Sequence, residues 1–200
     1  EMLRVLEAPE DLPIPIEEVR EYCRAPLDES DDRILERCLK AAISFFQDRT
    51  GQIVAPTLAE YRLDEWPCED IRVPYVPVRE VRFVKYVNEA GDEVTYSAPN
   101  WSWERTDDGA LITWSQLATI PATHLTQRGV IRIQFLAGYD IPGDSGSDVD
   151  PAYTLPEDMK IALLMLTSHW YDMRGLTTSE AVNSVPVAFE TLMNRFRVFA

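Results

Sequence analysis

The chain has 200 residues, of which 46% are hydrophobic and 26% are charged. These proportions are typical of a globular protein and exclude a disordered or fibrous chain. Lys and Arg number 19 against 34 Asp and Glu, which gives a net charge of −15. Such an acidic balance disfavours tight binding to a nucleic-acid backbone. The three cysteines form no Cys-x-x-Cys pair, so we expect a reducing cytoplasm and neither a disulfide framework nor a zinc site.

Helical periodicity predicts two helices in the first quarter of the chain. The first spans about residues 15–24, and the second spans about 30–49, where apolar residues recur at three- and four-residue spacing. Acidic residues crowd the start of the second helix, where they complement the helix dipole. Thr50-Gly51 is a typical helix end. Both segments are therefore expected to be amphipathic helices.

Over about residues 58–139 the hydrophobic period changes to two. Apolar and polar side chains alternate in 130–135, which predicts a half-buried antiparallel strand. In an earlier strand, Val81, Phe83 and Val87 are expected to share one buried face. Gly- and Asp-containing turns separate these segments, so the region is predicted to form a meander of short strands.

A segment rich in Gly, Ser, Pro and Asp follows at 140–155 and predicts a long loop, either mobile or ordered by a partner. Asp144, Asp148 and Asp150 could gather a calcium ion, but their spacing departs from the EF-hand pattern. Loop carboxylates are more often simply solvated. We therefore expect an acidic mobile loop and no metal site.

Two further helices are predicted at about 156–175 and 186–197. In the first, Lys160, Thr167 and Arg174 recur every seven residues as a narrow polar stripe, and the rest of the surface is largely apolar. Such a helix must be buried on several sides, by its own sheet or by a neighbouring subunit. The whole chain is thus predicted to be a single α+β domain, with mainly helical N- and C-terminal segments packed on a central antiparallel β-meander.

An enzyme is the first alternative function. Gly143-Asp144-Ser145-Gly146 is similar to the nucleophile segment of trypsin-like proteases, but such a serine needs a histidine base. His124 stands only a short way upstream and lacks the sequence around it that those proteases have. A serine hydrolase using Ser145 therefore stays the lesser hypothesis, and no cofactor motif is present.

A monomeric binding module is the second alternative function. Arg82 and Tyr86 could lie on one strand face and bind a single-stranded nucleic acid through stacking and charge. The net charge of −15 opposes this, and a polar outer sheet face is the simpler interpretation. No segment is apolar enough to predict a membrane span, and no targeting segment is expected.

Taken in order, the motifs resemble the head–tail connector (adaptor) family of long-tailed double-stranded DNA phages and gene transfer agents. The fragments that carry this resemblance extend over most of the chain: Pro15-Ile-Glu-Glu-Val19, Asp31-Asp32-x-Ile34-Leu35, Pro74-x-x-Pro77-Val78, Val130-x-Ile-x-Phe-x-Ala-Gly-Tyr139, Lys160-x-Ala162, His169-Trp170-Tyr171-x-x-Arg174, and Pro186 before Leu192 and Arg195.

The resemblance implies a structural virion protein of the neck, made in the host cytoplasm and without catalytic activity. It would assemble with itself as a ring, commonly a dodecamer, beneath the portal protein. The ring would extend the DNA channel, let DNA pass without specific binding, and present a surface to a tail-proximal head-completion or stopper protein. Arg195, Phe196, Arg197 and Phe199 are expected to dock against the portal.

Overall fold

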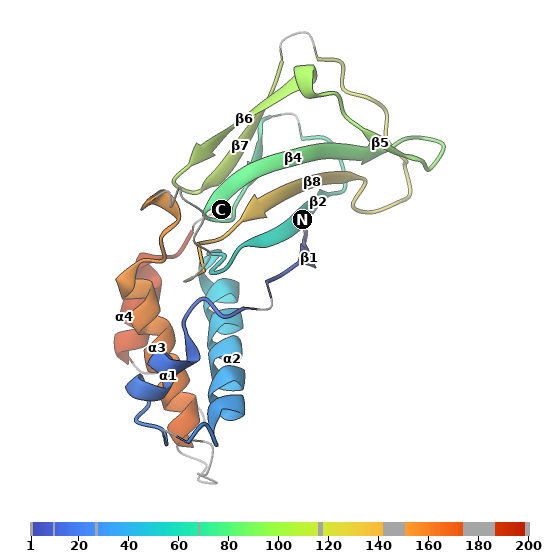
Figure 1. Ribbon diagram of the computed structural model, residues 1–200. Coiled ribbons are helices and arrows are strands. Elements are labelled where there is room, and N and C mark those ends of the chain that lie inside the picture. The colour runs from blue at the N-terminus through green and yellow to red at the C-terminus, as the bar shows by residue number, and fades with distance from the viewer. Residues whose placement is uncertain are drawn as a thin grey trace. The chain divides into compact units, whose positions relative to one another are not determined.

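The computed structural model describes residues 2–9, 11–26, 28–67, 69–115, 118–141, 151–173 and 187–198 (Figure 1). The chain folds into two compact units, and each is discontinuous in sequence. A sheet unit is built from the described residues of Glu1–Pro9 and Pro56–Gly138. A helical unit is built from those of Glu10–Ala55 and Tyr139–Val198.

The helical unit contains four α-helices close to the predicted positions. They are α1 (Ile16–Tyr22), α2 (Asp32–Thr50), α3 (Glu157–Met173) and α4 (Val187–Arg195), and a short 3-10 turn, η2 (Pro151–Tyr153), precedes α3. The helix α2 ends as predicted, because Gly51 adopts a φ of 74° that favours glycine. The predicted loop 140–155 is described only at its two ends, and its second end contains the η2 turn.

The core of the helical unit surrounds α3, which contacts α1, α2 and α4. Phe46 of α2 and Phe189 of α4 are fully buried, with ring centroids 6.5 Å apart. The predicted polar stripe on α3 is wrong at Thr167, whose side chain is fully buried. Its hydroxyl donates to the Leu163 carbonyl oxygen at 2.7 Å, so the helix backbone satisfies it without solvent. Arg174 lies outside the described residues.

The sheet unit contains eight strands in two antiparallel sheets (Figure 1). The five-stranded sheet has the order β1-β2-β8-β4-β5, and the three-stranded sheet has the order β3-β7-β6. Sequential hairpins form β4–β5 and β6–β7, whereas β8 lies between β2 and β4. The strand bounds are β1 (Met2–Glu7), β2 (Thr57–Leu63), β3 (Ile71–Val73), β4 (Val78–Val87), β5 (Glu93–Thr95), β6 (Trp101–Thr106), β7 (Gly109–Trp114) and β8 (Ile131–Ala137), with a 3-10 turn, η1 (Ala98–Asn100), before β6.

The register of the five-stranded sheet corrects one prediction about β4. Two register shifts interrupt its pairing with β8, one between Val78 and Glu80 and one between Val81 and Phe83. A bulge adds a residue on one strand and changes the alternation of its side chains. Val84 therefore takes the buried position, and Phe83 is 45% exposed rather than part of the buried face.

The hairpin that joins β6 to β7 depends on Gly109. Its φ is 138°, and a Cβ added there would lie 1.9 Å from the Val73 carbonyl oxygen of β3. Only glycine permits this close approach of backbone to backbone. The turn thus holds β7 against β3 in the three-stranded sheet.

Four helices together with two antiparallel sheets confirm the predicted α+β class. The first strand, β1, lies in a segment for which no element was predicted. Nothing in the fold tests whether the two units behave as one domain, so the single adaptor domain over residues 1–200 stays a prediction.

Candidate assembly surfaces

The end of the helical unit, where the predicted docking residues lie, is fastened to the end of α2. The Val198 amide donates to the Thr50 carbonyl oxygen at 2.8 Å, and the Gln52 side-chain amide donates to the Phe196 carbonyl oxygen at 2.9 Å. The Phe196 ring lies 6.0 Å from that of Phe46, centroid to centroid. Residues 196–198 are therefore held by both main-chain hydrogen bonds and core packing.

Gln52 extends this attachment into the core. Its side-chain oxygen accepts a hydrogen bond of 2.9 Å from the Tyr139 hydroxyl, so one glutamine bridges Tyr139 and Phe196. Gln52 and Tyr139 are both at least nine-tenths buried. Burial raises the pKa of Tyr139 to about 12, because desolvation disfavours the phenolate. The phenol therefore stays a neutral donor at physiological pH.

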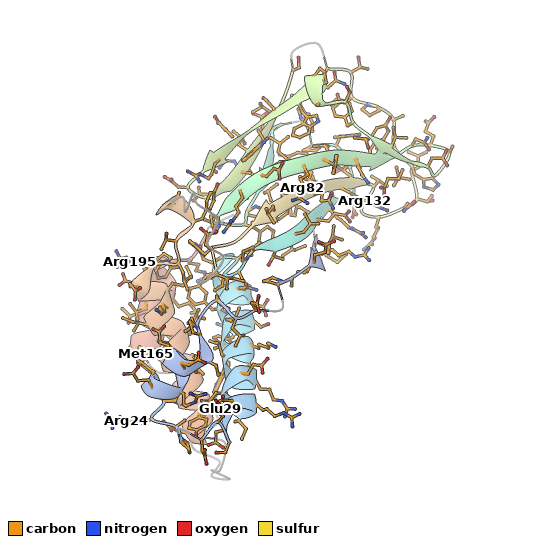
Figure 2. All side chains as sticks on the ribbon, viewed as in Figure 1. Arg24, Glu29, Arg82, Arg132, Met165 and Arg195 are labelled. Atoms are coloured by element: carbon orange, nitrogen blue, oxygen red, sulfur yellow. The ribbon has the colours of Figure 1, made fainter. Side chains whose placement is uncertain are left out.

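The four predicted docking residues lie in different environments. Arg195 is exposed at the end of α4 and forms an ion pair with Asp158 of α3 (Figure 2). Phe196 is half-buried against its own core, whereas Arg197 is exposed. Phe199 lies outside the described residues. A binding surface built from this segment would thus use Arg195 and Arg197, because the Phe196 ring already packs in the helical unit.

The apolar surface of α3 is mostly covered within its own unit. Met159, Leu163 and Leu166 are fully buried, and α1, α2 and α4 all contact this helix. Ile161 remains 43% exposed. The apolar circumference therefore does not by itself require a neighbouring subunit, which was one of the two explanations that the sequence left open.

The outer face of the five-stranded sheet carries paired charges. Lys85 Nζ lies 2.8 Å from a carboxylate oxygen of Glu93, and Arg132 forms an ion pair with the other oxygen. The hydrogen bond from Lys85, followed by the charges of Lys85 and Arg132, lowers the pKa of Glu93. Arg82 likewise lies 3.1 Å from a carboxylate oxygen of Glu80. Lys85, Arg132 and Arg82 thus each lie against a carboxylate; Figure 2 labels the two arginines.

The structure does not bring together the proposed nucleic-acid platform of Arg82 and Tyr86. Tyr86 lies opposite Ile131, which is fully buried, and its ring packs 6.0 Å from the ring of Trp66. Arg82 is exposed and paired with Glu80. Stacking on bases requires an open ring next to unpaired cations, whereas Tyr86 is half-buried and Arg82 is paired with a carboxylate.

A cleft of about 370 Å³ lies in the sheet unit between residues of both sheets. Leu63, Ile71 and Leu111 give it an apolar lining, and its charged lining residues include Glu69 and Asp108. None of the described residues that line it is a histidine, a cysteine or a serine. The described lining therefore does not supply the Ser–His pair that the trypsin-like hypothesis requires.

The residues proposed for other chemistry are only partly described. Ser145, Asp144, Asp148 and Asp150 lie outside the described residues. His124 is half-buried, and its Nδ1 lies 3.4 Å from the Thr126 amide. In the described ranges, no three His, Cys, Asp or Glu side chains gather as metal ligands would. No helix among the described residues has the length and apolar character needed to cross a membrane.

Solved structures of similar fold come from particles of a gene transfer agent. A chain in the neck of the empty particle, computed with C6 symmetry, is 23% identical with a TM-score of 0.76. A chain in the virion of the native particle is 22% identical, and one in the native neck, computed with C12 symmetry, is 21% identical, both with a TM-score of 0.75. Each comparison covers 100% of this chain and 97% of the other. The likeness shows a shared fold, and no curated protein matches.

A family model described as head completion protein matches residues 14–197. The family consists of structural virion proteins and not of enzymes, so the predictions of a non-catalytic virion component and of a connector-type family are confirmed. The hypothesis of a serine hydrolase using Ser145 is correspondingly wrong. Because the match extends over nearly the whole chain, this protein belongs to the head completion protein family and is a structural protein of the head–tail neck.

Proposed function

We propose that this protein is the head–tail adaptor of its particle. It assembles as a ring, commonly a dodecamer, beneath the portal protein, extends the DNA channel, and presents its other side to a tail-proximal stopper or head-completion protein. The chains of similar fold are described as parts of a virion or of a neck, two of them computed with C6 or C12 symmetry. A cyclic ring built from repeated contacts is the assembly that this symmetry suggests.

The proposed channel role rests on two observations: the net negative charge of the chain, and the pairing of cations on the sheet unit with carboxylates. The net charge is −15, and Lys85, Arg132 and Arg82 on the sheet unit each lie against a carboxylate. Proteins bind DNA through unpaired Lys and Arg side chains, which neutralise phosphates and release the counterions condensed on the DNA. A surface with an excess of carboxylates and with paired cations repels a duplex, so DNA can pass through the ring without adhering.

Cryo-electron microscopy of particles that contain the chain tests the ring directly. We expect density for a ring of this fold between the portal and the tail. Absence of the chain from purified particles, or a position away from the neck, would contradict the adaptor role. A gel-shift assay with duplex DNA at low salt tests the channel argument separately, and tight binding would overturn it.

We also propose that the C-terminal segment of the helical unit docks against the portal through its exposed arginines. Arg195 and Arg197 supply positive charge there. Phe196 supplies only a small apolar surface, because it is half-buried and its ring packs against Phe46. Phe199, which the structure does not describe, is included as the sequence suggested. The charged part of this surface can be altered without changing the core, because both arginines are exposed.

Point variants test this docking better than a truncation does. Deleting residues 195–200 would also remove Phe196 from its packing against Phe46 and would therefore disturb the fold. Arg197→Glu should weaken capture of the chain by immobilised portal, whereas Arg82→Glu, a charge reversal on the sheet unit, should not. Equal capture of both variants would contradict docking through this end.

The two units are proposed to act as one adaptor domain. Circular dichroism follows mainly the helical unit, whereas tryptophan fluorescence follows mainly the sheet unit, which holds Trp66, Trp101, Trp103 and Trp114. Coincident unfolding transitions are expected for a single domain. Two separate transitions would show that each unit folds by itself.

A further inference from the structure

The two edges of the five-stranded sheet differ in how they are protected. At one edge, β5 is only three residues long and carries Glu93, and the neighbouring β4 is interrupted by two bulges. Short strands, charges and bulges are the features by which natural sheets prevent edge-to-edge association. The other edge is β1, a strand of six residues that pairs with β2 on one side only and has a single register shift, between Val5 and Glu7.

The strand β1 exposes apolar side chains along its length. Met2 is 59% exposed, Val5 is 53% exposed and Leu6 is 36% exposed. In the described part of the chain, no strand lies beside its outer edge, so the main-chain groups of that edge face outward. A long edge that is both open and apolar is a template for an added strand.

The charges of β1 specify which strand would fit. A register shift between Val5 and Glu7 places Arg4 opposite Glu60 and Glu7 opposite Leu58. Because Leu58 and Glu60 are two residues apart in β2, Arg4 and Glu7 share one face of the sheet. Val5 is the ladder position between them, and Leu6 is the extra residue of the bulge. An antiparallel partner must therefore place a basic residue opposite Glu7, an apolar residue opposite Val5 and an acidic residue opposite Arg4.

The sequence of β1 itself, Arg4-Val5-Leu6-Glu7, has this pattern. We propose that β1 binds β1 of a second copy of this chain in antiparallel register. Arg4 of each copy then lies opposite Glu7 of the other, and the Val5 residues of the two copies lie opposite each other at the two-fold axis, with Leu6 as the extra residue of the bulge. Arg4 and Glu7 are both exposed, and neither forms an ion pair with another described residue of the chain, so both are available for this contact.

The proposed contact has two-fold symmetry, because the same strand is used by both copies. A two-fold contact closes on itself and cannot propagate around a cyclic ring. It is therefore a contact of the free protein, separate from the ring contacts of the adaptor. Its failure would leave the proposed function unaffected, since that function is tested on assembled particles.

Sedimentation equilibrium of the purified chain tests the pairing. We expect a monomer–dimer equilibrium, and Val5→Lys should raise the dissociation constant about tenfold or more, because two lysines then replace the apolar Val5–Val5 pair at the two-fold axis. Phe83→Lys is the matched control, since Phe83 is 45% exposed on the same sheet but away from this edge. Circular dichroism confirms that each variant is folded. A chain that stays monomeric up to about 100 µM, or a dimer unaffected by Val5→Lys, would overturn the proposal.

A charge exchange tests the register. Glu7→Arg alone should self-associate about tenfold more weakly, because two arginines then face each other across the contact. Mixing it with Arg4→Glu should restore association as a heterodimer, in which every position pairs opposite charges. A mixture that associates no better than its components would overturn the proposed pairing of Arg4 with Glu7.

Discussion

The helical and sheet units differ in how completely they satisfy their own polar and apolar groups. In the helical unit, the buried polar side chains of Gln52, Tyr139 and Thr167 all form hydrogen bonds. In the sheet unit, the buried indole N–H groups of Trp66 and Trp114 have no acceptor among the described residues. The sheet unit also has the open edge at β1.

This difference indicates which unit depends on its own packing and which has surface left for contacts. Buried polar groups are normally paired, and exposed apolar edges are normally protected. A helical unit that meets both conditions should be sensitive to changes in its core. The sheet unit should be sensitive to its backbone geometry at Gly109, where the chain approaches the Val73 carbonyl oxygen closely.

Phe46→Ala should give the largest loss of stability. The ring is fully buried and packs against Phe189 and Phe196, so its removal leaves a cavity at the centre of the helical unit. We expect the free energy of unfolding to fall by about 3–5 kcal/mol, measured by urea denaturation with circular dichroism. Phe83→Ala, at an exposed position of the sheet unit, should cost less than about 1 kcal/mol. Similar losses would remove the distinction between the units.

Gly109→Ala should give the second largest effect and should act through backbone geometry. The added Cβ would lie 1.9 Å from the Val73 carbonyl oxygen at a φ of 138°, so β3 or the turn must move. We expect a loss of at least about 2 kcal/mol, measured by tryptophan fluorescence. Gly91→Ala is the control, because its φ of 91° is also unfavourable but nothing lies within 4 Å of the new Cβ. If both variants lose the same free energy, the close approach to β3 is unimportant.

The helices could be predicted closely because their periodicity and end signals are local. Gly51 terminates α2 as expected, and the buried face of α4 at Phe189 and Met193 follows from helical spacing. Thr167 was assigned to a solvent-facing stripe because it is polar. Its hydroxyl instead bonds to the Leu163 carbonyl oxygen, a contact that sequence spacing does not distinguish from solvation.

The strand faces and the candidate surfaces were harder to predict, because they depend on strand pairing and long-range contacts that the sequence does not specify. Phe83 fits the alternation of β4, but the bulge beside it changes its face, and a bulge leaves no local signal in a charged strand. In residues 2–7 apolar side chains occur at both odd and even positions, so the sequence lacks the alternation that predicts a strand. The strand β1 is identified by its pairing with β2. The role of Gln52 in binding the Phe196 carbonyl oxygen joins residues far apart in sequence.

Tyr139→Phe should have an intermediate effect on the free energy of unfolding. The variant should be less stable than the wild type at neutral pH and more stable at high pH. At neutral pH the loss of the hydrogen bond to Gln52 should cost about 1–2 kcal/mol. Burial raises the pKa of Tyr139 from 10.0 to about 12, so its stabilisation of the fold is fully present below pH 10 and is lost as the pH rises towards 12. The wild type should therefore lose roughly 2–3 kcal/mol relative to the variant over this window. Parallel pH profiles of the two proteins would show that Tyr139 is not buried as described.

Glu93→Gln should have the smallest effect, because the ion pairs of Glu93 lie at a solvent-exposed position of the sheet unit. We expect a loss of less than about 1 kcal/mol at neutral pH. Lys85 and Arg132 lower the pKa of Glu93 in the folded state, so its contribution is present above the unfolded pKa of about 4.3 and is lost as the pH falls below it. The difference between wild type and variant should thus vanish in acid. Glu89→Gln, in the turn between β4 and β5, is the control for removing an exposed carboxylate at neutral pH. A large loss for Glu93→Gln would instead mean that charge pairing, and not backbone geometry, determines the stability of the sheet unit.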